Sequence, residues 1–188
     1  MVSSVSRMLL GLALGLGLVA CTTSSANLPN EGKPVVSDPQ SRARVHTELA
    51  ALYYQQGSMK TALDELANAI RIDPQYAPAY SMQGLVYMQL GEQSQANSNF
   101  QKAIALAPND PDIRNNYGLF LCETRQYQQG IAQLDLAIAN PLYNTPVRAL
   151  VNASRCARDM GDATLANRYR QQAERYGATA NDFSSKLQ

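Results

Sequence analysis

The sequence predicts an all-α protein built as a solenoid of about four antiparallel helix hairpins. Pro74 and Pro108 lie 34 residues apart, and the positions between them recur at the same interval. The alternation of apolar and polar residues that marks half-buried β-strands is not found along the sequence. A fixed period of this length is the signature of stacked helical repeats, so the chain is expected to bind other molecules rather than to transform them.

The best-formed unit runs from Tyr80 to Pro108. Its small residues stand where two helices must touch closely, and its aromatic residues fill the space beside them. Gly91 permits the tight turn between the helices, and Pro108 stops the second helix from continuing. The pattern resembles the tetratricopeptide repeat. The positions that carry this resemblance are Tyr80, Gly84, Tyr87, Gly91, Ala96, Phe100, Ala103 and Pro108.

The same pattern defines the neighbouring units. The first spans about Ala43 to Gln75, the second Tyr76 to Asn109, and the third begins at Pro111. The fourth is weaker and runs two residues late after a proline-containing connector. Residues 41–177 are therefore assigned to the repeat domain, and residues 178–188 to a tail or a short capping helix. Supporting positions are His46, Ala50, Tyr53, Gly57, Ala62, Leu66 and Ala69 in the first unit, Gly161 and Ala166 in the fourth, and Ala180, Phe183 and Leu187 in the tail.

Residues 1–20 carry the features of a secretory signal peptide. Arg7 supplies positive charge, and the apolar run from Met8 to Ala20 is too short to span a membrane. The run ends in Leu18-Val19-Ala20-Cys21, which resembles a bacterial lipobox. Residues 1–20 are thus expected to be removed and Cys21 to be lipidated. The alternative is an ordinary signal peptide with cleavage near a coincidental cysteine.

The residues after the predicted cleavage point suggest where the chain is held. Thr22 rather than Asp follows Cys21, which under the Gram-negative sorting rule implies the outer membrane, with the protein facing the periplasm. Residues 21–40 are rich in polar residues and Pro, and are expected to form a lipidated flexible tether between membrane and fold. Several acyl chains on one cysteine give stable anchoring.

Cys122 and Cys156 remain once Cys21 is assigned to lipid. A pair of cysteines in an oxidising compartment usually forms a disulfide. Both lie on the first helices of adjacent hairpins, which are neighbours in a solenoid. We therefore expect a disulfide that fastens the fourth unit to the third. The alternative is two buried free thiols packed as small apolar side chains.

The charged and chemically reactive residues do not indicate catalysis. The chain has 16 basic and 15 acidic residues, a balance that does not favour a nucleic-acid partner. His46 is the only histidine and holds an aromatic position of the first unit, where a packing role is expected. The sequence lacks the paired catalytic groups, phosphate-binding loop and clustered ligands that enzymes use. It predicts a non-catalytic protein with no cofactor, no metal and no small-molecule substrate.

In tetratricopeptide proteins the first helices line a concave groove through positions 2, 5, 9, 12 and 13 of each unit. Carried onto this sequence, these positions predict an apolar strip with polar edges, suited to a partner's amphipathic helix or extended segment. The alternative is that some of these side chains pack against neighbouring hairpins. Basic residues are too sparse among them to favour a clamp for a C-terminal carboxylate. The predicted groove residues are Arg44, Thr47, Ala51 and Tyr54, then Ser81, Leu85, Met88 and Gln89, then Asn115, Leu119, Cys122 and Glu123.

The third unit carries a more specific resemblance. It reads Asn115-Asn116-Tyr117-Gly118-Leu119-Phe120-Leu121-Cys122, followed by Pro141-Leu142-Tyr143, Pro146, Asn152-Ala153 and Cys156. Together with the lipobox, these residues resemble the PilF/PilW family of outer-membrane lipoproteins in type IV pilus biogenesis. The resemblance covers nearly the whole chain and implies a disulfide between Cys122 and Cys156. Family members usually continue for about two more repeats, whereas this chain ends after four.

The family resemblance implies a protein-binding scaffold of the pilotin kind. It would bind the outer-membrane secretin subunit or another pilus-assembly protein, and aid the secretin's localisation and multimerisation and the stability of the pilus. The alternative is a general periplasmic tetratricopeptide adaptor for envelope assembly or for cell-wall enzymes, since these repeats serve many partners. The expected contacts are therefore with proteins and, through the lipid, with a membrane.

Overall fold

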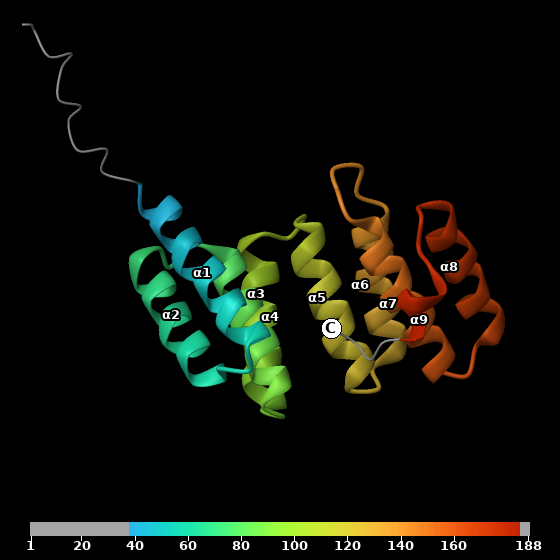
Figure 1. Cartoon of the computed structure of the whole chain (residues 1–188), viewed down its shortest axis with the longest axis horizontal. Helices are drawn as coiled ribbons and strands as arrows, with labels where there is room; N and C mark the ends of the chain where they lie inside the picture. The colour runs from blue at the N-terminus through green and yellow to red at the C-terminus, as the bar shows by residue number, and fades with distance from the viewer. Residues whose placement is uncertain (1–37, 185–188) are drawn as a thin grey trace, which may run out of the picture. The chain divides into compact units, whose positions relative to one another are not determined.

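A computed structural model describes residues 38–184, all within one unit that spans residues 36–188. Every regular element in the described range is an α-helix, which confirms the all-α prediction (Figure 1). The signal peptide, Cys21, the tether up to residue 37 and Leu187 lie outside the described residues. The helices are α1 (Pro39–Gln55), α2 (Met59–Ile72), α3 (Ala77–Gln89), α4 (Gln93–Leu106), α5 (Pro111–Glu123), α6 (Tyr127–Ile138), α7 (Pro146–Asp159), α8 (Ala163–Arg175) and α9 (Ala180–Ser184).

The helices pair into consecutive hairpins: α1 with α2, α3 with α4, α5 with α6, and α7 with α8. Each hairpin meets the next in two ways. Its second helix packs against the first helix of the following hairpin, and the first helices of adjacent hairpins also touch. In Figure 1 the pairs follow one another in chain order, from α1 and α2 to α7 and α8. This arrangement confirms the predicted solenoid.

Acidic caps and prolines set where α1 and α5 begin. Asp38 accepts a hydrogen bond from the backbone N–H of Ser41 at 2.9 Å, and Pro39 occupies the first turn of α1. The helix therefore starts inside the predicted tether of residues 21–40, which is two residues too long. Asp110 caps α5 in the same way, accepting from the backbone N–H groups of Asp112 and Ile113.

Glycines let the two helices of a hairpin approach closely, as the repeat pattern predicts. In the second hairpin a Cβ atom on Gly84 would lie 2.8 Å from Cε1 of Phe100. In the third, a Cβ on Gly118 would lie 2.7 Å from Cγ of Leu134 and 2.9 Å from the backbone oxygen of Gly130. A real side chain does not fit at such distances in a close-packed interior, so glycine at these two positions fixes the spacing of the helices.

The last part of the fold departs from the regular repeat. The connector of residues 139–145 is longer than those of residues 73–76 and 107–110, as Pro141 and Pro146 predict. The Tyr169 hydroxyl donates a 2.8 Å hydrogen bond from α8 to the Asp135 carboxylate on α6. Burial and this carboxylate raise the pKa of Tyr169, so the phenol stays a proton donor and ties the two helices together.

The tail forms the short helix α9, which continues the series of first helices. It contacts α7, as α7 contacts α5. Phe183 on α9 packs against the core around α7 and α8, and the guanidinium of Arg170 lies 5.5 Å from its ring centroid. The predicted C-terminal helix is therefore present, and it lies beside α7.

Each hairpin turn places one residue in the left-handed region of backbone conformation. Gly57, Gly91 and Gly161 hold this position with φ of 75°, 77° and 91°. In the third hairpin the same position is Arg125, with φ of 63°. Arginine adopts this conformation at an energetic cost that glycine avoids.

Replacing Arg125 by glycine is therefore expected to raise the free energy of unfolding by about 0.5–1 kcal/mol, because relief of backbone strain exceeds the extra entropy of an unfolded glycine. Urea denaturation followed by circular dichroism measures the change. Gly91→Ala is the matched control, since a Cβ there meets no atom within 4 Å; it should lower stability. A lower free energy of unfolding in Arg125→Gly would contradict the inference that the backbone is strained at this position.

Candidate partner-binding groove

A groove of about 1570 Å³ runs along the first helices of all four hairpins. It is apolar toward α1 and α3 and polar toward α7. Most of the residues predicted from the repeat pattern line it: Ala51, Tyr54, Leu85, Met88, Gln89, Asn115, Leu119 and Glu123.

Four predicted groove residues lie elsewhere. The side chain of Arg44 pairs with Glu48 on the same helix at 3.5 Å, and the hydroxyl of Thr47 donates back to the Ala43 carbonyl. Ser81 is 3% exposed because it lies between adjacent first helices. The fourth, Cys122, lines a separate cavity of about 100 Å³. These four side chains therefore pack or form bonds outside the groove and do not line it.

The fourth hairpin contributes groove residues that the sequence prediction omitted. The prediction from positions 2, 5, 9, 12 and 13 covers the first three units only. Carried into the fourth unit with its two-residue delay, the same rule gives Arg148, Val151, Arg155, Arg158 and Asp159. All of these except Val151 line the groove, together with Asn152 and with Phe183 of α9. The sequence therefore contains the information needed to find these residues, because the two-residue delay of the fourth unit gives their positions.

The expectation that basic residues are sparse in the groove was therefore wrong, because α7 brings three arginines to it. Arg148 lies 3.7 Å from Asp112, and Arg158 lies 3.3 Å from Asp159. Arg155 donates to the backbone carbonyl of Asp182 on α9. Partial burial raises the pKa of Asp112, against the opposing effect of Arg148. These arginines have partners within the chain, so this end of the groove is polar and nearly charge-balanced.

A chain of side-chain amides crosses the first helices beneath the groove. Asn152 Nδ2 on α7 donates to Asn115 Oδ1 on α5 at 3.0 Å, and Asn115 Nδ2 donates to Asn116 Oδ1 at 3.2 Å. Asn116 Nδ2 then donates to the hydroxyl of Ser81 on α3 at 3.1 Å. Asn115 is only 1% exposed. This relay fixes three adjacent first helices relative to one another, because a buried amide must keep its partners.

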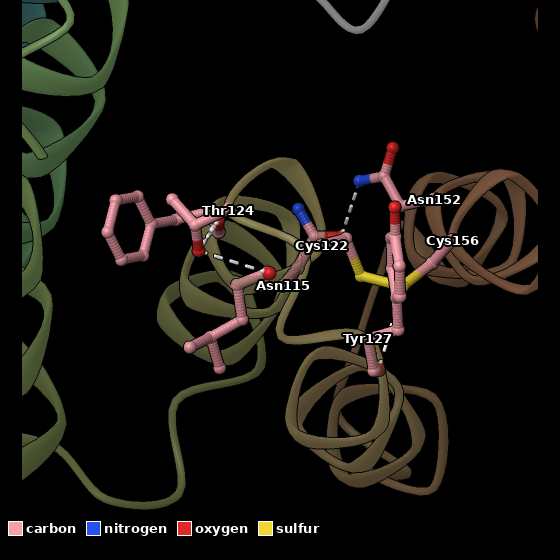
Figure 2. The surroundings of a disulfide bond; sticks show 8 residues. Asn115, Cys122, Thr124, Tyr127, Asn152 and Cys156 are labelled. Atoms are coloured by element: carbon pink, nitrogen blue, oxygen red, sulfur yellow. Dashed lines mark hydrogen bonds between the residues drawn. A yellow bond between two sulfur atoms is a disulfide. The ribbon is translucent and has the colours of Figure 1, made fainter. Parts of the chain in front are cut away.

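The disulfide lies beside this relay (Figure 2). Cys122 of α5 and Cys156 of α7 are joined with their Cα atoms 5.5 Å apart. The Cys156 sulfur lies 3.7 Å from the carbonyl oxygen of Tyr127 on α6. Gly130 faces the bond as well, since a Cβ there would clash with Cys122 Sγ. The disulfide and the amide relay together join the third and fourth hairpins at the polar end of the groove.

Asn115→Ala is expected to lower the free energy of unfolding by about 1–2 kcal/mol, because it removes a buried amide and leaves the half-buried Asn152 amide without its acceptor. Thermal or urea unfolding of the purified chain measures the loss. Asn99→Ala is the matched control: Asn99 is half-buried like Asn152, but its amide donates to the Gln95 carbonyl of its own helix, so its removal should change stability by less than about 0.5 kcal/mol. Equal effects of the two variants would show that the relay contributes nothing.

The one histidine pairs with a carboxylate inside the first hairpin. His46 Nδ1 lies 2.6 Å from Glu65 Oε2, a contact that joins α1 to α2. Within residues 38–184 no group of three His, Cys, Asp or Glu side chains could hold a metal ion. In the same range no helix combines the length and apolar character needed to cross a membrane.

Comparison with known proteins identifies the repeat. A family model described as TPR repeat matches residues 50–91 and 84–121. Residues 50–121 therefore contain tetratricopeptide repeats. Proteins with this repeat bind protein partners, and no enzyme family is indicated.

Two relatives and one solved structure resemble the protein along most of its length. It is 28% identical over 154 residues to an uncharacterised protein of Haemophilus influenzae, covering 82% of each chain. It is 28% identical over 166 residues to the type IV pilus assembly protein PilF of Pseudomonas aeruginosa, covering 87% of this chain and 64% of PilF. The crystal structure of PilW, a widely conserved type IV pilus biogenesis factor, matches with a TM-score of 0.71 at 27% identity. That match covers 75% of this chain and 64% of PilW. The chain therefore spans just under two thirds of the length of PilF and PilW.

Proposed function

We propose that this protein is a non-catalytic scaffold in type IV pilus biogenesis that binds the outer-membrane secretin and aids its localisation and multimerisation. The observation that carries the proposal is the homology to PilF across 87% of the chain. The similarity in fold and sequence to PilW supports the same assignment.

The groove offers the surface for such an interaction. Its apolar part is lined by Tyr54, Leu85, Met88 and Leu119, which suits the apolar side chains of a partner's helix or extended segment. The relay and the disulfide hold the neighbouring first helices in place. A groove that is already formed loses less conformational entropy when it binds, and so gains affinity.

Lipidation of Cys21 would place this groove at the membrane where the secretin assembles. The sequence Leu18-Val19-Ala20-Cys21 supports lipidation, and Thr22 supports the outer membrane with the protein facing the periplasm. A flexible tether between Cys21 and α1 would raise the effective concentration of the groove near a membrane-embedded partner. In this mechanism the protein acts by holding the secretin subunit where it must multimerise.

The test is deletion of the gene followed by complementation. Loss of heat- and detergent-resistant secretin multimers, and their return with the wild-type chain, is the expected result on immunoblots. A Leu85→Glu/Met88→Glu chain should not restore the multimers, because two charges would enter the apolar part of the groove. Leu142→Glu is the control, since Leu142 is 81% exposed and does not line the groove.

Unchanged multimers in the deletion strain would refute the secretin role. If a pull-down from such a strain complemented with the wild-type chain recovered envelope-assembly components or cell-wall enzymes, the general periplasmic adaptor would take its place. Circular dichroism of each variant shows whether a negative result comes from the groove or from misfolding.

A further inference from the structure

Methionine side chains are concentrated in the apolar part of the groove. Met59, Met82 and Met88 all line it. Met59 is the first residue of α2, and the other two lie on α3. The one other methionine within residues 38–184 is Met160, which directly follows α7 and does not line the groove. Most of the methionines in the described part of the chain are therefore gathered at one surface.

These three side chains are supported by the core and can also be reached from outside. Each of them is half-buried. Met59 and Met82 pack against the core of the first hairpin, and Met88 packs against the core that contains Phe100 and Phe120. The groove that they line has a volume of about 1570 Å³, which is far larger than a small oxidant such as hypochlorous acid. Such an oxidant can therefore reach the methionines when the groove is empty.

No thiol within residues 38–184 competes for an oxidant. Cys122 and Cys156 are already joined in the disulfide, so the methionine thioethers are the only reduced sulfur atoms in that range. Two-electron oxidants convert a methionine thioether to a sulfoxide. With hypochlorous acid, the net reaction gives the sulfoxide, a proton and a chloride ion. The sulfur gains one oxygen atom and loses the two electrons that reduce the chlorine.

This oxidation would change the chemistry of the groove and leave its supports in place. Each sulfoxide puts a polar oxygen beside apolar groove residues such as Tyr54 and Leu85. A bound apolar side chain would deprive that oxygen of water, at a cost in free energy. The large side chains that hold the first two hairpins together, Leu66, Val86 and Phe100, are fully buried and carry no sulfur. The modification should therefore act on binding and spare the fold.

We propose that Met59, Met82 and Met88 form an oxidation site, at which hypochlorous acid converts the thioethers to sulfoxides and so releases the partner from the groove. The inference rests on the proposed use of the groove for binding a protein, but it does not depend on which protein is bound. Methionine suits this role because its side chain is apolar and adaptable when reduced and polar when oxidised.

The test places the photocrosslinking residue p-benzoylphenylalanine at Gln89 of the full-length chain, produced in its own cells. Gln89 is exposed and lines the groove, so its adduct to another protein on an immunoblot reports an occupied groove. A brief pulse of hypochlorous acid before irradiation should lower the adduct yield at least about tenfold, because the partner would have to cover the sulfoxides. Mass spectrometry of the treated chain should find one added oxygen atom on each of the three groove methionines.

Leucine variants separate the groove methionines from every other target of the oxidant. Leucine has a volume close to that of methionine and forms no sulfoxide, so the Met59→Leu/Met82→Leu/Met88→Leu chain should give the same yield with and without the pulse, to within about twofold. Met160→Leu is the matched control. Met160 is also half-buried but lies outside the groove, so this chain should lose its adduct as the parent chain does. If the triple variant formed no adduct before the pulse, each single leucine variant should be less sensitive than the parent.

Several results would overturn the proposal. One is an equal loss of adduct in the parent and the leucine chains, which would place the oxidation elsewhere, including on the partner. Others are sulfoxide on Met160 alone, an unchanged yield from a chain whose groove methionines are oxidised, and no adduct at Gln89 in untreated cells. Loss of the helical circular dichroism signal from the purified, oxidised chain would show damage to the fold instead. An oxidation-sensitive adduct to a protein other than the secretin would refute the secretin role and leave this inference intact.

Discussion

Phe100→Ala is expected to lower the free energy of unfolding by about 4 kcal/mol, the range measured for large buried aromatic residues. Phe100 is fully buried, and its ring centroid lies 5.8 Å from that of Tyr117 and 5.4 Å from that of Phe120. Its ring also fills the space that Gly84 leaves open. Truncation removes the aromatic contacts and leaves a cavity between the second and third hairpins. Urea denaturation followed by far-ultraviolet circular dichroism measures the loss.

The position of Phe100 gives the prediction a second observable. In a stack of repeats, stability is the sum of each repeat's own stability and its contacts with its neighbours. Because Phe100 joins two hairpins, its loss should broaden the unfolding transition or divide it into two. Phe183→Ala is the matched control, since this phenylalanine is only half-buried on α9. If both variants lowered the free energy of unfolding equally, Phe100 would contribute no more to the packing of the hairpins than the half-buried Phe183 does.

The repeat architecture could be predicted because packing imposes the same residue types at each turn of the solenoid. Gly84 and Gly118 show this directly, since any Cβ at either position would clash with the facing helix. Because a small residue is needed at this position in each hairpin, the 34-residue period can be read from the sequence. The turn of the third hairpin shows that the preference for glycine is not absolute. Arg125 adopts the glycine conformation there, so the fold survives a departure that costs about 1 kcal/mol.

The groove was predicted only in part, for a different physical reason. Tyr54, Leu85 and Leu119 follow from the repeat because they occupy fixed positions on first helices. Ser81 has the same register but is buried, since Asn116 reaches it from the next helix. Such bonds between side chains far apart in the sequence depend on the helix separation, which the period does not specify. The arginines of α7 were missed because the longer connector shifts the phase of the last hairpin.

Breaking the disulfide is expected to lower the free energy of unfolding by about 4 kcal/mol, because the bond closes a loop of 34 residues in the unfolded chain. The oxidised and reduced forms of the same protein should be compared by urea denaturation. This comparison leaves every side chain in place, so it separates the covalent link from the cavity that a Cys156→Ala substitution would create. The Cys122→Ala/Cys156→Ala chain should be no more stable than the reduced form and should not respond to reductant.

The loss should be concentrated in the fourth hairpin. The fourth hairpin diverges most from the repeat pattern, and its contact with the third includes the disulfide, the Asn152–Asn115 bond and the Tyr169–Asp135 bond. Reduction removes the strongest of these links, so the backbone amides of α7 and α8 should exchange with deuterium faster while those of α3 and α4 keep their protection. Since α7 supplies the polar end of the groove, a reduced chain should also lose partner contacts there first. Uniform acceleration along all the helices would show instead that the disulfide stabilises the stack as a whole.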